Sequence, residues 1–559
     1  MNSKNINYIF SSILVGLFLI SQVLASNLPV YVEDDIYDFL ERMESREIIS
    51  RYSGLALPLN RAEIAQFLNQ IDQSSAQLNQ IEKKIYRQIR SEYYLELRNE
   101  KEQESGTRIK FINTGSPAQT FKKIWTIDPD QKEQHLLKYE SEKGFIWGDM
   151  DFNAQNQTRN DLNRQVLGNQ VLLRGGLNEK LSGYLQFDSY LKMNAGEFDE
   201  LLPEEKGRLI NEDVFFSNAY AGLTYSNKIF STGLYQQPLL WGASRENNLT
   251  FSNNGPPFPY FRFSTEIGWL KYSLVHGGLV NDSTSHKFRN VDPDIRDMPK
   301  NVAAQRFEIS LFQGHTYLGI NEMVIYSNRT LEWSYVVPFN FYFAAEHYLE
   351  DRDNTLLSFD IKSKIFKNTQ AYATFFFDEL KWSKLVSEWW GNKQAVQLGV
   401  RNHSYLGNFP FDLQVEYTAV RPWTYTHKYF NNNYTNDRYG LGFPYGPNSQ
   451  LFYLEGQISL SYRLKLFLEY NYLQQGQNTE ETIFGSQATD NYELRDPEYD
   501  NSTGWLMGDI LTRNQIEFGA RFEYINNCFL YGSLQYRTDA TSSENNTYLY
   551  STLGASINF

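Results

Sequence analysis

The chain has 559 residues and a formal net charge of -14, which argues against nucleic acid as a partner because phosphate binding needs a basic surface. One cysteine, Cys528, excludes an intrachain disulfide. Aromatic residues make up 16% of the chain, a heavy load for a soluble globular protein. Such rings suit both the interface girdles of a membrane barrel and a carbohydrate-binding surface, so composition alone does not distinguish these two classes of protein.

The amino terminus has the pattern of a secretory signal peptide over residues 1–25. Lys4 precedes an apolar run from Ile9 to Ile20, and Val23 and Ala25 form a small-residue cleavage pattern. The run is too short to span a bilayer, which disfavours the alternative of a membrane-anchor helix. No cysteine follows the small residues, which argues against a lipoprotein anchor.

Residues 26–105 are predicted to form a small helical periplasmic module of about three helices that packs on itself or against the rest of the chain. Asp34 precedes the first run of helical spacing, and Asn60 with Glu63 has the pattern of a capping box before the second. A linker is expected over 106–143. The apolar positions at helical spacing are Ile36, Phe39, Leu40 and Met43, then Ile64, Phe67, Leu68 and Ile71, then Leu78, Ile81, Ile85 and Ile89.

From Gly144 the apolar period changes to two, which is typical of strands. Within 515–524, Ile516, Phe518, Ala520, Phe522 and Tyr524 share one face, opposite Gln515, Glu517, Arg521 and Glu523. Apolar outward and polar inward is the pattern of a membrane β-barrel. A soluble β-sandwich also alternates, but it needs fewer long strands.

The predicted connections alternate between short and long, and candidate strands number about 18, an even count that fits bacterial barrels. Polar loops are expected at 155–165, 193–215, 237–259, 282–302, 328–356, 379–393, 421–450, 474–513 and 537–547. Short turns are expected near Asn178, Asn227, Gly268, Gly314, Asn368, Gly407, Arg463 and Asn526.

The last segment, 548–559, alternates and ends on Phe559. It resembles the terminal strand of Gram-negative outer-membrane barrels. If Phe559 ends in the periplasm, every short turn lies there and every longer loop lies outside the cell, as such barrels require.

No motif indicates an enzyme, a cofactor or a metal site. None of the seven histidines lies in a nucleophile elbow or at metal-ligand spacing. Two loops instead combine aromatic rings with amides and cations, the groups that stack on sugars and hydrogen-bond their hydroxyls. We predict that Trp241, Trp423 and Tyr425 stack on sugars. We predict that Arg245, Asn253, Asn254, Arg421 and His427 bind hydroxyls or uronates. The alternative is that these rings belong to the interface girdle and the small residues make turns.

Several segments resemble the Wzi family of capsule assembly proteins. They are Ile36-Tyr37-Asp38-Phe39-Leu40-Glu41-Arg42, 58–64, Trp241-Gly242, 249–257, 352–357 and Glu416-Tyr417-Thr418. The chain departs from the family in having Ala243 after Gly242, where the family has proline. The resemblance implies an 18-stranded outer-membrane barrel with a helical periplasmic module, which holds capsular polysaccharide and is neither an enzyme nor the export channel.

The sequence therefore predicts an all-β transmembrane antiparallel barrel over 144–559, in the bacterial outer membrane, that binds capsular or extracellular polysaccharide. Expected partners also include outer-membrane lipid and the barrel assembly machinery. The competing prediction is a substrate-selective porin whose polar lumen is lined by Lys465, Glu469, Glu517 and Arg521.

Overall fold

The computed structural model describes residues 27–97, 108–111, 130, 135–141, 144–177, 180–193, 209–211, 215–281, 298–379, 381–384 and 387–558. The predicted signal peptide, most of the predicted linker and Phe559 lie outside these residues.

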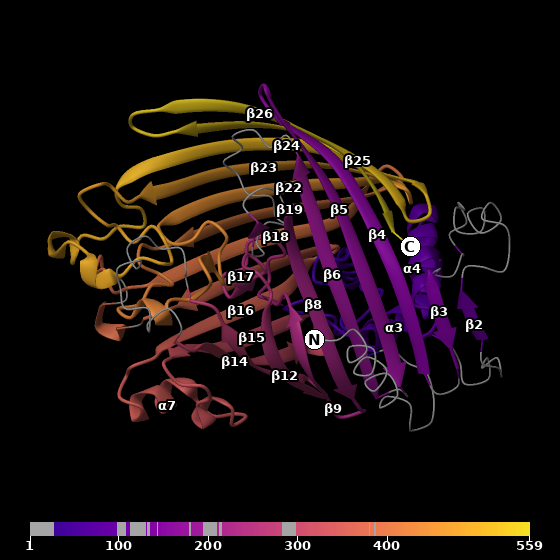
Figure 1. The fold of residues 1–559 in the computed structure, drawn as a ribbon, viewed down its shortest axis with the longest axis horizontal. Helices are drawn as coiled ribbons and strands as arrows, with labels where there is room; N and C mark the ends of the chain where they lie inside the picture. Colours follow the sequence, from indigo (N-terminus) through magenta and orange to yellow (C-terminus); the bar gives the residue numbers. More distant parts are fainter. Residues whose placement is uncertain are drawn as a thin grey trace, which may run out of the picture.

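Eighteen long antiparallel strands of the described chain close into a barrel, because the last strand pairs with the first (Figure 1). This confirms the predicted fold class. Three short strands, β2 (Arg108–Phe111), β3 (Leu137–Glu140) and β7 (Leu209–Asn211), extend the sheet. The barrel strands are β4 (Gly144–Arg159), β5 (Leu162–Leu177), β6 (Leu181–Met193), β8 (Phe215–Ser226), β9 (Phe230–Gln237), β12 (Phe258–Ile267), β13 (Leu270–Leu279), β14 (Lys300–Leu311), β15 (Thr316–Ser327), β16 (Asn354–Phe366), β17 (Thr369–Phe377), β18 (Gln394–Leu406), β19 (Phe409–Val420), β22 (Ser449–Ser461), β23 (Leu464–Gln477), β24 (Asp509–Ile525), β25 (Cys528–Ala540) and β26 (Asn545–Asn558).

The two ends of the barrel differ in their connections. At one, the short-turn end, the strands join through brief turns at 227–229, 268–269, 312–315, 367–368, 407–408, 462–463 and 526–527. These match the predicted turns, apart from Asn178, which lies outside the described residues. Gly268 and Gly407 have φ values of 65° and 64° there, a conformation that glycine adopts at no steric cost. The opposite end, the long-loop end, includes 238–257, 328–353, 378–393, 421–448 and 478–508.

Strand β24 shows how the alternating sequence produces two faces. Ile516, Phe518 and Tyr524 point away from the barrel and are 45%, 51% and 61% exposed, whereas Glu523 is buried toward the lumen. An apolar outer face and a polar interior are what a barrel that crosses a membrane requires.

Residues 27–97, the N-terminal part that the structure describes, form three α-helices, α2 (Asp35–Ser45), α3 (Arg61–Gln73) and α4 (Gln80–Glu92). Side-chain caps fix where they begin. Asp34 accepts a hydrogen bond from the Ile36 N–H at 2.9 Å, and Asn60 with Glu63 forms the predicted capping box. Each cap satisfies backbone donors that have no partner within the helix.

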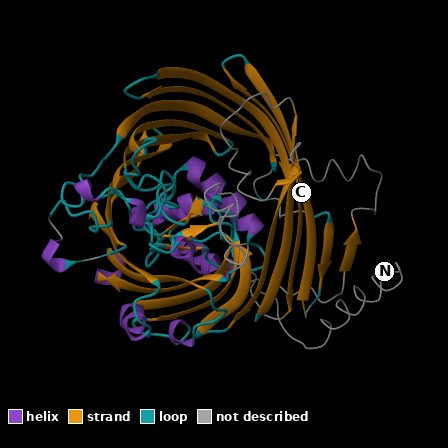
Figure 2. Cartoon of the chain, turned by 60° about the vertical axis from the view of Figure 1, so that its left-hand side comes forward, coloured by secondary structure: helices purple, strands orange, loops and turns teal. Residues whose placement is uncertain are grey.

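These helices lie inside the ring of strands, near the short-turn end (Figure 2). Asp35 pairs with Lys465 on β23 at 3.2 Å and with Arg521 on β24 at 2.5 Å. Asn79 donates to the Asn408 carbonyl in the turn between β18 and β19, at 3.0 Å. The module predicted to lie in the periplasm and to pack on itself or against the rest of the chain thus packs against the inner wall and occupies part of the lumen.

Candidate functional site

The loop at 238–257 folds inward and joins the N-terminal segment. Its strands β10 (Leu240–Trp241) and β11 (Phe251–Ser252) pair with each other, and β10 pairs with β1 (Ala56–Leu57). A three-stranded sheet thus forms inside the barrel. It brings a long loop into contact with a segment almost two hundred residues away in sequence.

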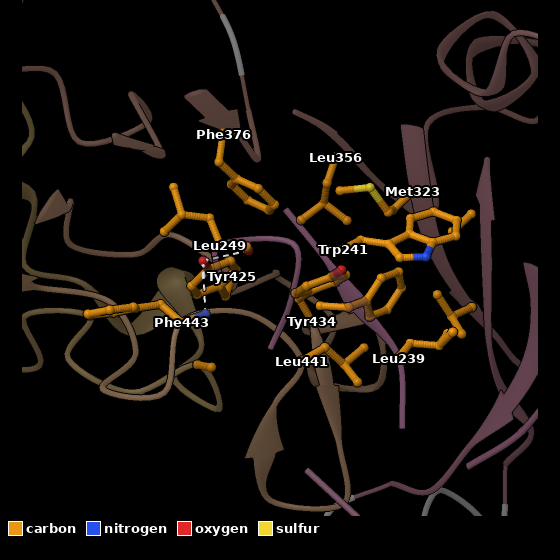
Figure 3. Packing of buried hydrophobic residues seen from close by; sticks show 14 of the residues in the cluster. Leu239, Trp241, Leu249, Met323, Leu356, Phe376, Tyr425, Tyr434, Leu441 and Phe443 are labelled. Atoms are coloured by element: carbon orange, nitrogen blue, oxygen red, sulfur yellow. Dashed lines mark hydrogen bonds between the residues drawn. The ribbon is translucent and has the colours of Figure 1, made fainter. Parts of the chain in front are cut away.

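Two of the rings predicted to stack on sugars lie in the core that this loop builds (Figure 3). Trp241 is fully buried, with its ring edge-on to Phe251 at 5.4 Å. Tyr425 is 1% exposed; its hydroxyl donates to the Leu249 carbonyl at 2.9 Å and accepts from the Phe443 N–H at 3.3 Å. Neither ring offers a face to a ligand at the surface, which corrects the role that we predicted for them.

Trp423 is also interior, at 4% exposure. The backbone N–H of Trp423 donates to the Gly485 carbonyl at 3.1 Å. A Cβ atom at Gly485 would lie 2.4 Å from the indole ring of Trp423. The close approach of loops 421–448 and 478–508 therefore requires glycine at this position. Arg421 is buried beside it and donates to the Thr503 carbonyl at 2.7 Å. Both side chains join loops together and are not exposed to a ligand.

His427 is buried, and burial lowers its pKa to about 3, with Lys393 and Lys428 acting in the same direction. The ring is therefore neutral at physiological pH. Its Nδ1 accepts a hydrogen bond from the Tyr429 N–H at 3.2 Å. A neutral, buried imidazole cannot pair with a uronate, so the predicted role of His427 does not fit this structure.

The remaining three predicted residues hold loop 238–257 in place. Arg245 pairs with Asp38 of α2 at 3.6 Å. Asn253 donates to Glu33 at 2.7 Å, and Asn254 donates to the Gly440 carbonyl at 3.3 Å. The predicted residues thus lie within the inward-folded loops, where Trp241, Arg421, Trp423, Tyr425 and His427 are buried. Arg245, Asn253 and Asn254 are half-buried, and Asn253 lines a cavity.

The described residues occupy the lumen in two layers, the helices near the short-turn end and the inward-folded loops beyond them. A cavity of about 540 Å³ remains beside β5, β6 and β8, and another of about 430 Å³ lies between the helices and β22–β25. Asp188 and Asn218 line the first cavity.

Loops 378–393 and 478–508 also form a partly exposed aromatic cluster that sequence reasoning missed. We call Trp389, Trp390 and Tyr492 the outer aromatic cluster; all three side chains are half-buried. The rings of Trp389 and Trp390 lie 5.8 Å apart, and Trp390 and Tyr492 lie 5.0 Å apart. The adjacent tryptophans within a predicted long loop were a signal that could have identified the cluster.

Cations surround these rings. The Arg495 guanidinium lies 4.0 Å from the Trp390 ring, and Lys393 Nζ lies 4.1 Å from the Tyr492 ring. Arg495 is itself fixed by Asp500 through two hydrogen bonds of 2.8 and 3.2 Å. The Trp390 N–H donates to the Asp500 carbonyl at 3.0 Å, which ties loop 378–393 to loop 478–508. Fixed, partly exposed rings beside cations are suited to polar ligands with apolar faces.

Within the described residues, no group of three or more His, Cys, Asp or Glu side chains is arranged to hold a metal ion. In the same ranges, no helix is long and apolar enough to cross a membrane.

The closed barrel with its apolar outer face and short and long connections defines an outer-membrane β-barrel protein. The chain is similar in structure to Wzi, described as an Escherichia coli outer-membrane protein involved in group 1 capsule assembly and as a carbohydrate-binding β-barrel. The TM-score is 0.59 at 15% identity, over 95% of this chain and 99% of that one. This likeness concerns the fold.

Two further solved structures are porin-like barrels. Pseudomonas aeruginosa OpdK with vanillate has a TM-score of 0.43 at 10% identity, and a BenF-like porin from Pseudomonas fluorescens has 0.43 at 9%. Each aligns with 74% of this chain and 98% of its own. No protein-family model matches the chain, and neither does any curated protein sequence.

Proposed function

We propose that this protein is a non-enzymatic, lectin-like outer-membrane barrel that binds capsular or extracellular polysaccharide at the cell surface and assists capsule assembly, as the Wzi family does. On this proposal the short-turn end faces the periplasm and the long-loop end faces the medium. The observation that carries the proposal is the outer aromatic cluster, held beside Arg495 above a lumen that loops and helices occupy.

Three physical features support polysaccharide as the ligand class. Half-exposed indoles provide flat apolar faces for pyranose rings. Arg495 and Lys381, which lies 5.6 Å from the Trp389 ring, can bind hydroxyls or carboxylates. The similar Wzi structure is described as carbohydrate-binding.

A porin, the competing prediction, needs a continuous aqueous path. Lys465 and Arg521, predicted to line such a path, do line the cavity of about 430 Å³, but both pair with Asp35 of α2, a helix that occupies the lumen there. This favours a binding protein over a channel.

The first prediction concerns the cluster itself. Trp389→Ala combined with Trp390→Ala should weaken polysaccharide binding by about tenfold to a hundredfold, since each lost stacking contact contributes on the order of 1 kcal/mol. Binding of the purified barrel to a glycan array, and polymer retention by cells, would measure the loss. Trp333→Ala is the matched control, because Trp333 is a 71% exposed tryptophan in another loop. Equal binding by the double variant and the unaltered protein would contradict the proposal.

A further inference from the structure

Loop 328–353, unlike loops 238–257 and 421–448, folds outward onto the barrel wall. It contains η6 (Trp333–Tyr335) and α7 (Tyr342–Tyr348), which lies beside β14 and β15 at the edge of the barrel (Figure 1). Tyr335 and Tyr342 pack against Ala303, Val324 and Tyr326. The residues that alternate with Ala303 and Val324 along β14 and β15 point inward and belong to the interior core: Val302, Ala304, Met323 and Ile325. Alternation therefore places the loop on the outer face.

The loop covers polar side chains on that face. Gln305 and Glu322 are paired across β14 and β15 and point outward, and both are buried. Gln305 donates to the Asn340 carbonyl at 2.5 Å and to Glu322 at 2.8 Å. Glu322 accepts from the N–H groups of Tyr342 at 3.1 Å and Phe343 at 3.3 Å. An uncovered carboxylate on a lipid-facing wall is destabilising, so the loop satisfies groups that lipid cannot.

Between residues 331 and 343 the exposed side of the loop is apolar. Its exposed large side chains are Leu331 (41%), Trp333 (71%), Val337 (53%), Phe339 (61%), Phe341 (56%), Phe343 (48%) and Tyr348 (88%). The same outer face continues onto neighbouring strands through Ile320 on β15 and Phe359 on β16, each 37% exposed. The loop's charged groups lie toward its two ends. Arg329 pairs with Glu332 at 3.2 Å and also with Asp353, and the exposed residues His347, Glu350, Asp351 and Arg352 lie at and after the end of α7.

We propose that loop 328–353 is an interfacial anchor whose aromatic surface inserts among the acyl chains of the membrane's outer leaflet. A patch of this kind exposed to water is unfavourable. This patch is continuous with the lipid-facing wall, and it carries the aromatic side chains that prefer membrane interfaces. The anchor is independent of the polysaccharide proposal.

A depth measurement by spin labelling tests the anchor. In a Cys528→Ser background, Phe341→Cys is labelled with a nitroxide, and the protein is reconstituted in phosphatidylethanolamine–phosphatidylglycerol vesicles. Collision with oxygen, which partitions into hydrocarbon, is compared with collision with a water-soluble nickel chelate. Leu398→Cys on the outer wall is the lipid control, and Tyr429→Cys in loop 421–448 is the water control; these side chains are 49% and 53% exposed.

The expected result is that oxygen accessibility exceeds nickel accessibility at Phe341, as at Leu398, with the reverse order at Tyr429. Nickel accessibility equal to that at Tyr429 would overturn the proposal. So would a label shielded from both reagents whose spectrum sharpens on dilution with unlabelled protein, since that outcome means contact with a second copy. Phe343→Cys provides a second position should Phe341→Cys fail to fold.

Discussion

One carboxylate oxygen of Asp378 joins a barrel strand to the loop core, the buried apolar cluster of the inward-folded loops around Tyr425 and Tyr434. It follows β17 directly, is 4% exposed, and its Oδ2 accepts from the Tyr425 N–H at 2.6 Å. Its Oδ1 is buried without a hydrogen-bond partner in the described part of the chain. Burial raises the pKa of this carboxyl to about 7 from 3.8, although Lys393 acts in the opposite direction. The group that holds Tyr425 in place therefore gains its charge only near neutrality.

This shift predicts a pH dependence that one substitution should remove. Between about pH 4 and pH 7 the folded loop layer binds a proton that the unfolded chain has lost, so its stability decreases as pH rises through that window and is level above it. Asp378→Asn keeps an acceptor for the Tyr425 N–H and cannot titrate. Limited proteolysis of loop 421–448 at pH 4, 5.5, 7 and 8 should therefore show a smaller pH effect in the variant. The same slope in both proteins would exclude Asp378 as its source.

At the scale of elements, α2 docks through acidic side chains that face cations on the barrel's inner wall. Glu41 pairs with Lys362 on β16 and lies 3.5 Å from Arg401 on β18. Glu44 pairs with Lys364 at 3.0 Å. The carboxylate side chains of α2 and the lysine side chains of the barrel strand are all buried in these pairs. Removing Glu41 would leave Lys362 and Arg401 charged in the interior without their nearest carboxylate.

Glu41→Ala should therefore destabilise the docked helix by about 3–5 kcal/mol, the range for a buried ion pair that loses one partner. The measurement is the denaturant midpoint of the folded protein in detergent, together with protease cleavage within α2. Glu47→Ala is the matched control, because Glu47 and His315 are more than half exposed and 3.8 Å apart, a geometry that contributes about 0–1 kcal/mol. Equal midpoints for the two variants would show that α2 is held by apolar packing alone.

The elements themselves could be predicted from local pattern, but their docking could not. The capping box of Asn60 and Glu63 and the alternation through Ile516 and Phe518 are local signals, and the structure contains both elements. That Asp35 would meet Lys465 depends on a contact between residues 430 positions apart. For the same reason the sequence identified Trp241 as an aromatic loop residue but not its burial, which depends on β1 and β10 pairing across the lumen.

At the scale of the whole molecule, two separate layers obstruct the barrel. One is the helical segment near the short-turn end, and the other is the loop core around Tyr425 and Tyr434. They meet where β1 pairs with β10. Because each layer has its own apolar core, we expect either to persist in part when the other is removed.

The unaltered protein should consequently show no steady conductance in a planar bilayer, while a variant that lacks residues 27–97 should conduct weakly. Removing the helices opens the short-turn end and removes strand β1, which pairs with β10 through Ala56 and Trp241. Loops 238–257 and 421–448 still cross the lumen in this variant. Heat-modifiable gel mobility establishes that the variant barrel has closed before any current is interpreted. A folded variant that conducts no current would mean that the loop core closes the barrel without the helices. A wide, steady current through the unaltered protein would contradict the occupied lumen and favour the porin function, because a wide aqueous path would have to bypass both packed cores.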